Sequence, residues 1–157
     1  MIKDEESVVR ILRKDWFANG KLLHVAFALR RGETYISVNR PAIETFNSDV
    51  ASFVAQHPDY DFSEASYSYC AAKLNVGDIR DIKVGLGDRT AKIEVEVEPR
   101  GEHVKSHAGI FTRYEGRNLK GNGTIQIMQE NVSADDILLK VRQKLLQMSV
   151  IEYSKIR

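Results

Sequence analysis

The sequence predicts an α+β fold, a single domain over residues 1–157 with a mostly antiparallel sheet and two main helices packed against it. In Thr90–Pro99, three β-branched residues alternate with four charged residues, so a strand there has one apolar and one charged face. Two other segments, beginning at Asn47 and at Ser133, carry apolar residues at helical spacing. Short β-rich segments separated by turn residues bring the expected sheet to about six or seven strands.

The first forty residues predict three strands joined as a meander. The apolar residues after Val8 are too irregular to separate strand from helix by period alone, and we favour a strand over Val8–Phe17. Asn19-Gly20 favours a tight turn, which would pair this strand with Lys21–Leu29. A third strand is then expected from Tyr35, ending before Pro41.

A helix is predicted over Asn47–His57. Val50, Phe53 and Val54 fall on one helical face, and Pro58 ends the segment. This helix should lie with its apolar face on the sheet.

The middle of the chain is less regular. Tyr67–Leu74 fits both a two-residue and a helical period, and we favour a strand. Val76–Ile82 resembles one short helical turn between strands, and Gly85–Asp88 resembles the turn that precedes the alternating strand.

A second long helix is predicted from Ser133, because Ser133 and Asp136 approximate a capping box. Leu138, Val141 and Leu145 then form an apolar stripe. The stripe could pack on the sheet or on a partner, and the charge pattern does not separate the two. The tail Ile151–Arg157 is expected to extend this apolar face.

The composition is that of a globular domain, with 43% hydrophobic and 29% charged residues. Lys and Arg number 23 against 22 Asp and Glu, so the whole chain has no concentrated positive charge. Nonspecific nucleic-acid binding depends on such charge, so we expect no nucleic acid as a partner.

The single cysteine, Cys70, cannot form an internal disulfide, which fits a reducing compartment. The charged N-terminal residues do not resemble a secretory signal, and no apolar run reaches the length of a membrane span. We therefore expect a cytoplasmic protein without a membrane partner.

The segment Arg100–Gly123 holds five basic residues and two acidic ones, so it is the first candidate for binding an anionic small molecule. A solvated loop is the simpler alternative. If the segment is a strand, His103, Lys105 and His107 share one face.

His103 and His107 also invite a metal interpretation, since residues at i and i+4 share a face of a helix. In a strand the same two residues stand about 13 Å apart, too far to ligate one ion. We therefore predict no metal site and no cofactor.

The second candidate is the group of Tyr35, Asn39 and Arg40, where a guanidinium at a strand end could bind an anion, with Arg113 adding charge. An arginine that only caps the sheet is the alternative. Gly116–Gly121 lacks the lysine of a phosphate-binding P-loop. No catalytic residue can be assigned.

Two functions remain open. The first is a binding or interaction module without catalytic activity, which meets a protein partner or a second copy through the C-terminal helix or a sheet edge. The second is a small enzyme or sensor of an anionic small molecule, phosphorylated, nucleotide or carboxylate, bound by Arg40, Tyr35, His103, Lys105, His107 and Arg113.

Overall fold

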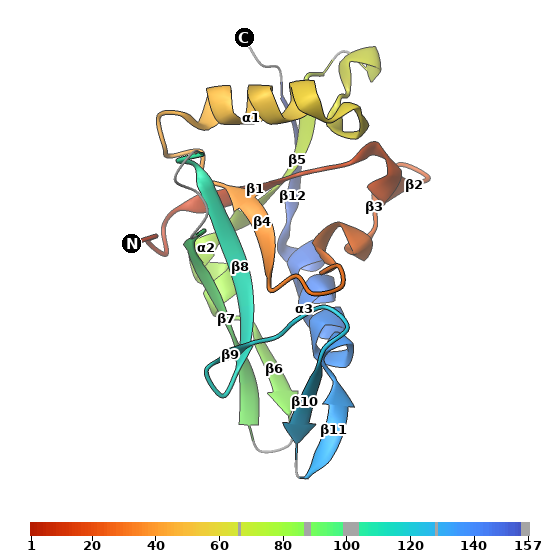
Figure 1. The fold of residues 1–157 in the computed structure, drawn as a ribbon. Helices are drawn as coiled ribbons and strands as arrows, with labels where there is room; N and C mark the ends of the chain where they lie inside the picture. The colour runs from red at the N-terminus through yellow and green to blue at the C-terminus, as the bar shows by residue number, and fades with distance from the viewer. Residues whose placement is uncertain (66, 87–88, 99–103, 128, 155–157) are drawn as a thin grey trace.

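The computed structural model describes residues 1–65, 67–86, 89–98, 104–127 and 129–154, and it confirms the α+β class (Figure 1). The helices are α1 (Phe46–Gln56), α2 (Val76–Arg80) and α3 (Ala134–Met148). The 3₁₀ turns are η1 (Lys14–Trp16), η2 (His24–Phe27), η3 (Pro58–Tyr60) and η4 (Ser63–Ala65). The strands are β1 (Ser7–Ile11), β2 (Phe17–Ala18), β3 (Lys21–Leu22), β4 (Tyr35–Asn39), β5 (Tyr69–Asn75), β6 (Lys83–Leu86), β7 (Arg89–Val97), β8 (His107–Tyr114), β9 (Arg117–Asn118), β10 (Thr124–Ile127), β11 (Glu130–Ser133) and β12 (Val150–Ser154).

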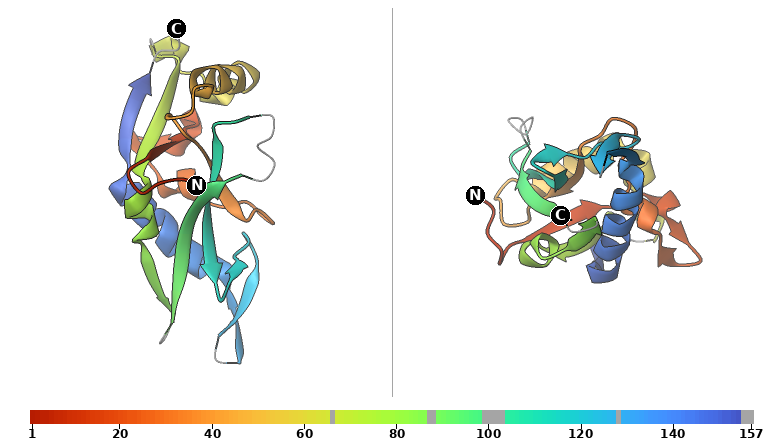
Figure 2. Two further views of the ribbon diagram at one scale, coloured as in Figure 1. Left: turned by 90° about the vertical axis from the view of Figure 1, so that its left-hand side faces the viewer. Right: turned by 90° about the horizontal axis from the view of Figure 1, so that it is seen from below.

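The main sheet has the strand order β12-β5-β1-β4-β8-β7-β6, with β9 beside β8, and every pairing in it is antiparallel. The strand β1 lies inside this sheet, between β5 and β4. The hairpins β6–β7 and β10–β11 both extend toward the end of the molecule opposite α1 (Figures 1 and 2).

The predicted N-terminal meander is wrong. The Asn19-Gly20 turn does form, but it joins only the two-residue strands β2 and β3. The chain leaves the sheet after β1 because Trp16, Ala26 and Phe27 turn inward through two 3₁₀ turns and are buried in the core. Burial of these side chains outweighs a longer hairpin.

Two hydrophobic cores lie on opposite faces of β1. Val8 and Leu12 face the larger core, which α2, α3 and η2 cover. Val9 and Ile11 face a smaller core formed with α1 and β5. Since successive strand residues point to opposite faces, β1 is buried on both sides, which explains its nearly continuous apolar sequence.

The alternation predicted for β7 is confirmed in its middle, where Ile93 and Val95 are buried. It fails at the end, where Val97 is 51% exposed and Glu98 is only 6% exposed. The Glu98 carboxylate accepts a hydrogen bond of 2.8 Å from the Tyr35 hydroxyl. This bond offsets part of the cost of burying a carboxylate.

Both long helices are confirmed. In α3, the Ser133 side chain accepts a hydrogen bond from the Asp135 N–H, and the apolar stripe is buried in the chain's own core. The predicted extension of this helical face is wrong, because Val150–Ser154 forms the strand β12 and pairs with β5. The β-branched Val150 and Ile151 suit a strand, and β5 offers them an open edge.

The strand predicted over Tyr67–Leu74 is confirmed as β5, which runs from Tyr69 to Asn75, and α2 is the short helical turn expected after it. The turn predicted at Gly85–Asp88 is wrong for Gly85 and Leu86, which belong to β6, and residues 87 and 88 lie outside the described residues.

Gly109 in β8 lies beneath the rings of Tyr35 and Phe111. A Cβ atom there would come within 2.9 Å of both rings. Phe111 is 6% exposed, and the hydrogen bond to Glu98 restrains Tyr35, so displacing either ring costs packing or a hydrogen bond.

We expect Gly109→Ala to lower the free energy of unfolding by about 1–3 kcal/mol through overpacking. Gly85→Ala is the matched control, because a Cβ atom at this strand position meets nothing within 4 Å. Urea denaturation of the two variants measures the difference. Equal stability of the two would contradict the tight packing at Gly109.

Candidate functional site

A cleft opens between β1 and β4. Among the described residues these strands pair only through Val9 and Asn39. If this antiparallel register continued for two more residues, Ile11 would lie opposite Ser37, but the strands separate there. Both residues instead line a cavity of about 270 Å³.

Arg10 occupies the point where the strands separate. Its Nε donates to the Ala26 carbonyl at 3.1 Å, and its Nη1 donates to the Ser37 carbonyl at 2.8 Å. Its guanidinium also lies 4.9 Å from the centre of the Trp16 ring. In the described part of the chain, no carboxylate lies within ion-pair distance of this guanidinium.

Burial is the main cause that lowers the pKa of the Arg10 guanidinium to about 10, and the nearby charge of Arg30 contributes to this lowering. The charge of Glu33 acts in the opposite direction. Arg10 remains a cation at neutral pH, because even the lowered pKa lies well above 7. A partly desolvated cation without a carboxylate partner is unusual and favours a bound anion.

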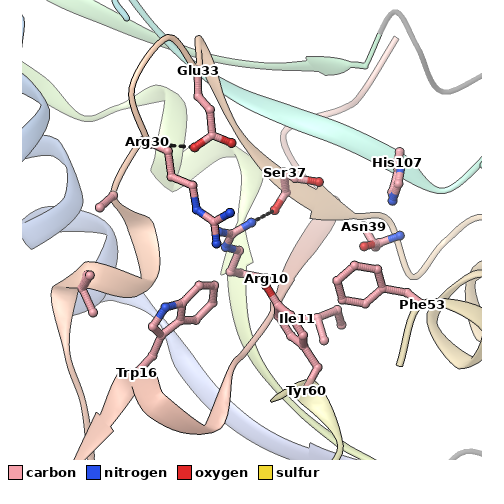
Figure 3. A pocket seen from close by; sticks show the side chains of 12 residues that line it. Arg10, Ile11, Trp16, Arg30, Glu33, Ser37, Asn39, Phe53, Tyr60 and His107 are labelled. Carbon is pink, nitrogen blue, oxygen red and sulfur yellow. Dashed lines mark hydrogen bonds between the residues drawn. The ribbon is translucent and has the colours of Figure 1, made fainter. Parts of the chain in front are cut away.

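Arg30 adds a second positive charge to the cleft. Figure 3 shows the guanidinium groups of Arg10 and Arg30 pointing toward one another. The carboxylate of Glu33 accepts a hydrogen bond of 2.6 Å from the backbone N–H of Arg30. Two cations and one carboxylate therefore surround the upper part of the cavity in Figure 3.

Aromatic side chains from three elements form one wall. Trp16 and Tyr60 meet edge to face with ring centres 5.9 Å apart, and Tyr60 meets Phe53 of α1 in the same way at 4.7 Å. Asn39 and His107, which pair across β4 and β8, close the far end. The cleft therefore combines positive charge with flat apolar surfaces.

Of the residues named in the two predicted candidate groups, His107 and Asn39 line this cleft. His103 lies outside the described residues. Lys105 is exposed in a turn, because β8 begins only at His107, so the predicted strand face shared by these residues does not form at Lys105.

Arg40 and Arg113 have carboxylate partners elsewhere. The guanidinium of Arg40 binds both carboxylate oxygens of Glu6 at 3.0–3.1 Å. Arg113 binds Glu96 at 2.6 and 2.9 Å and also donates to Asn118. Their charges are therefore largely neutralised within the fold.

Tyr35 lines a neighbouring hollow of about 620 Å³, together with Glu98 and Phe111. The two cavities share Glu33 and Ser37, so they are adjacent. The structure thus separates Tyr35, Arg40 and Arg113 from the cleft that contains His107.

Sequence reasoning missed Arg10, Arg30 and the three aromatic residues. One signal was available: Arg10 interrupts the apolar run Val8–Leu12, and a charged side chain inside such a run is seldom buried without a specific partner. Nothing in the sequence alone places Phe53 and Tyr60 near it.

Comparison of this chain with protein-family profiles, curated proteins and solved structures gave no significant match. None of the described helices is long and apolar enough to cross a membrane. Within the described ranges, no cluster of three His, Cys, Asp or Glu side chains is suited to holding a metal ion.

The ion pair between Glu6 and Arg40 gives a pH-dependent prediction. Burial alone would raise the pKa of Glu6, but the Lys3 N–H and the Arg40 guanidinium hold it below its ordinary value of 4.5. The ionised carboxylate therefore stabilises the fold above the unfolded-state pKa, and this contribution is lost as the pH falls through the folded-state pKa.

We expect Glu6→Gln to lower the free energy of unfolding by about 1–3 kcal/mol near neutral pH, since Arg40 loses its partner. The deficit should shrink as the pH falls below 4.5, the ordinary value for Glu6. Denaturation curves measured between neutral pH and pH values below 4.5 test this expectation, and the substitution Glu44→Gln at an exposed residue is the control. A deficit independent of pH would contradict the assigned role.

Proposed function

We propose that this chain is a binding module that holds a small organic anion in the cleft between β1 and β4. The observation that carries the proposal is the pair of guanidinium groups, Arg10 and Arg30, that face one cavity while Arg10 has no carboxylate partner among the described residues. A carboxylate or phosphate would supply the missing charge.

The size and lining of the cleft restrict the class of ligand that can bind. Its volume of about 270 Å³ lies near the lower end of small-molecule sites, which span about 300–1,000 Å³. The wall formed by Trp16, Tyr60 and Phe53 suits a flat or apolar group. We therefore propose a ligand with one acidic group and one ring or short apolar chain, rather than a dinucleotide.

The position of Cys70, the only thiol of the chain, supports binding without catalysis. Cys70 is fully buried and does not line the cleft, and its burial raises its pKa to about 11. Such a thiol is a poor nucleophile at neutral pH. A single reduced cysteine also supports the proposal of a cytoplasmic location.

The test of the proposal is calorimetric titration with benzoate, hydrocinnamate and phenyl phosphate, compared with the neutral benzamide. We expect the anions to bind, and Arg30→Gln to weaken them at least about tenfold because a charge-assisted hydrogen bond is lost. Arg31→Gln is the matched control: Arg31 is also exposed, and it lines the neighbouring hollow but not this cavity.

Three outcomes would count against an anion site. The first is the absence of heat or of any thermal shift with all three anions. The second is equal binding of benzamide and benzoate, and the third is an equal loss of affinity in the Arg30 and Arg31 variants.

A second candidate function is association through the edge strand β12. Val150 is 61% and Tyr153 51% exposed on this strand, which has β5 on one side only. Unpaired strand edges are common interaction sites. The helix α3 does not share this role through its apolar stripe, which is buried within the chain.

Size-exclusion chromatography with light scattering tests this second function. We expect a dimer whose population rises with concentration and which Val150→Lys abolishes, because the lysine places charge on the contacting edge. A monomer at every concentration would contradict self-association through β12.

A further inference from the structure

This inference rests on the proposed anion site. It uses the backbone groups that line the cleft to identify the ligand more closely. We infer that the ligand is the C-terminal residue of a peptide, whose carboxylate binds Arg10 and Arg30. Its own amide forms the strand pairing that Ile11 and Ser37 do not make with each other.

The orientation of β1 follows from its pairing with β5. The Leu12 N–H donates to the Cys70 carbonyl at 2.9 Å, and the register pairs Arg10 with Ala72. In an antiparallel ladder only alternate residues bond to a given neighbour, so the even-numbered residues of β1 bond to β5. The backbone N–H and C=O of Ile11 therefore face the cleft.

The orientation of β4 follows from Arg10. Because the Ser37 carbonyl accepts a hydrogen bond from the Arg10 side chain, it points toward β1. In an antiparallel strand the N–H and C=O of one residue point to the same side, so the Ser37 N–H also faces the cleft. Each wall therefore offers backbone groups in the arrangement that binds an extended chain.

The Arg10 guanidinium and the backbone of Ser37 lie where the α-carboxylate and the amide of a C-terminal residue would need them. The guanidinium that would bind the acid is itself hydrogen-bonded to the Ser37 carbonyl, at 2.8 Å from its Nη1. The acid and the strand edge therefore lie within about one residue of each other. In a C-terminal residue the carboxylate and the amide N–H are attached to the same Cα atom, which satisfies this spacing.

The aromatic wall then selects the side chain. A residue bound with its carboxylate on Arg10 has an adjacent surface formed by Trp16, Tyr60 and Phe53. An apolar or aromatic final residue fits this surface better than a charged one. The small volume, about 270 Å³, limits the enclosed part to the last residue and the amide before it.

The test compares four probes by calorimetric titration: N-acetylphenylalanine, its C-terminal amide, hydrocinnamate, and O-acetyl phenyllactate, in which an ester oxygen replaces the amide N–H. We expect N-acetylphenylalanine to bind at least about tenfold more tightly than each of the other three. Arg30→Gln should reduce this advantage over the C-terminal amide, and Arg31→Gln should leave it unchanged.

The outcomes separate this inference from the anion site on which it rests. Equal binding of hydrocinnamate, O-acetyl phenyllactate and N-acetylphenylalanine would overturn the inference and keep the anion site. No binding by any of them would overturn both.

A final arm distinguishes a peptide end from a free acylated amino acid. A pentapeptide that ends in phenylalanine should bind at least as tightly as N-acetylphenylalanine, and its C-terminally amidated form at least about tenfold more weakly. If the longer chain is excluded while N-acetylphenylalanine binds, the peptide assignment is wrong.

Discussion

The hydrogen bonds of the Arg10 side chain to Ala26 and Ser37 are the interaction on which the rest of this structure depends. They connect β1 to η2 and to β4 where the backbone ladder between β1 and β4 stops after Val9 and Asn39. A side chain thereby replaces a backbone pairing, and the space left by that pairing is the cleft. Both acceptors are neutral carbonyls, so these bonds do not neutralise the positive charge, which the nearby charge of Glu33 offsets only in part. One residue therefore serves both the fold and the proposed site.

The parts of the fold that depend on local sequence could be predicted. The alternation around Ile93 and Val95, the helix ending before Pro58 and the serine cap at Ser133 are set by neighbouring residues. The strand order could not be predicted in this way, because it is decided by contacts between segments that are far apart in the sequence. The meander failed since burial of Trp16 and Phe27 competes with local pairing, and no local pattern shows which burial is available.

The candidate site depends even more on tertiary contacts than the fold does. Composition identified Arg40 and Arg113 as cations, but their availability depends on Glu6 and Glu96, which tertiary structure brings to them. The cleft is formed by side chains that are far apart in the sequence, from Arg10 to His107. His107 was anticipated because it belongs to the segment that is rich in basic residues, and Asn39 because it precedes Arg40 at a predicted strand end. A charge becomes informative only once its neighbours are known.

The separation of β1 from β4 also has a mechanical consequence. It divides the main sheet into two plates, β12-β5-β1 and β4-β8-β7-β6, whose common joint contains one backbone pairing, the Arg10 side chain and the ion pair between Glu6 and Arg40. A rotation of one plate against the other would break few backbone hydrogen bonds, so its resistance comes from these side chains and from packing across the larger core. A molecule seated at the joint would therefore fix the angle between the plates.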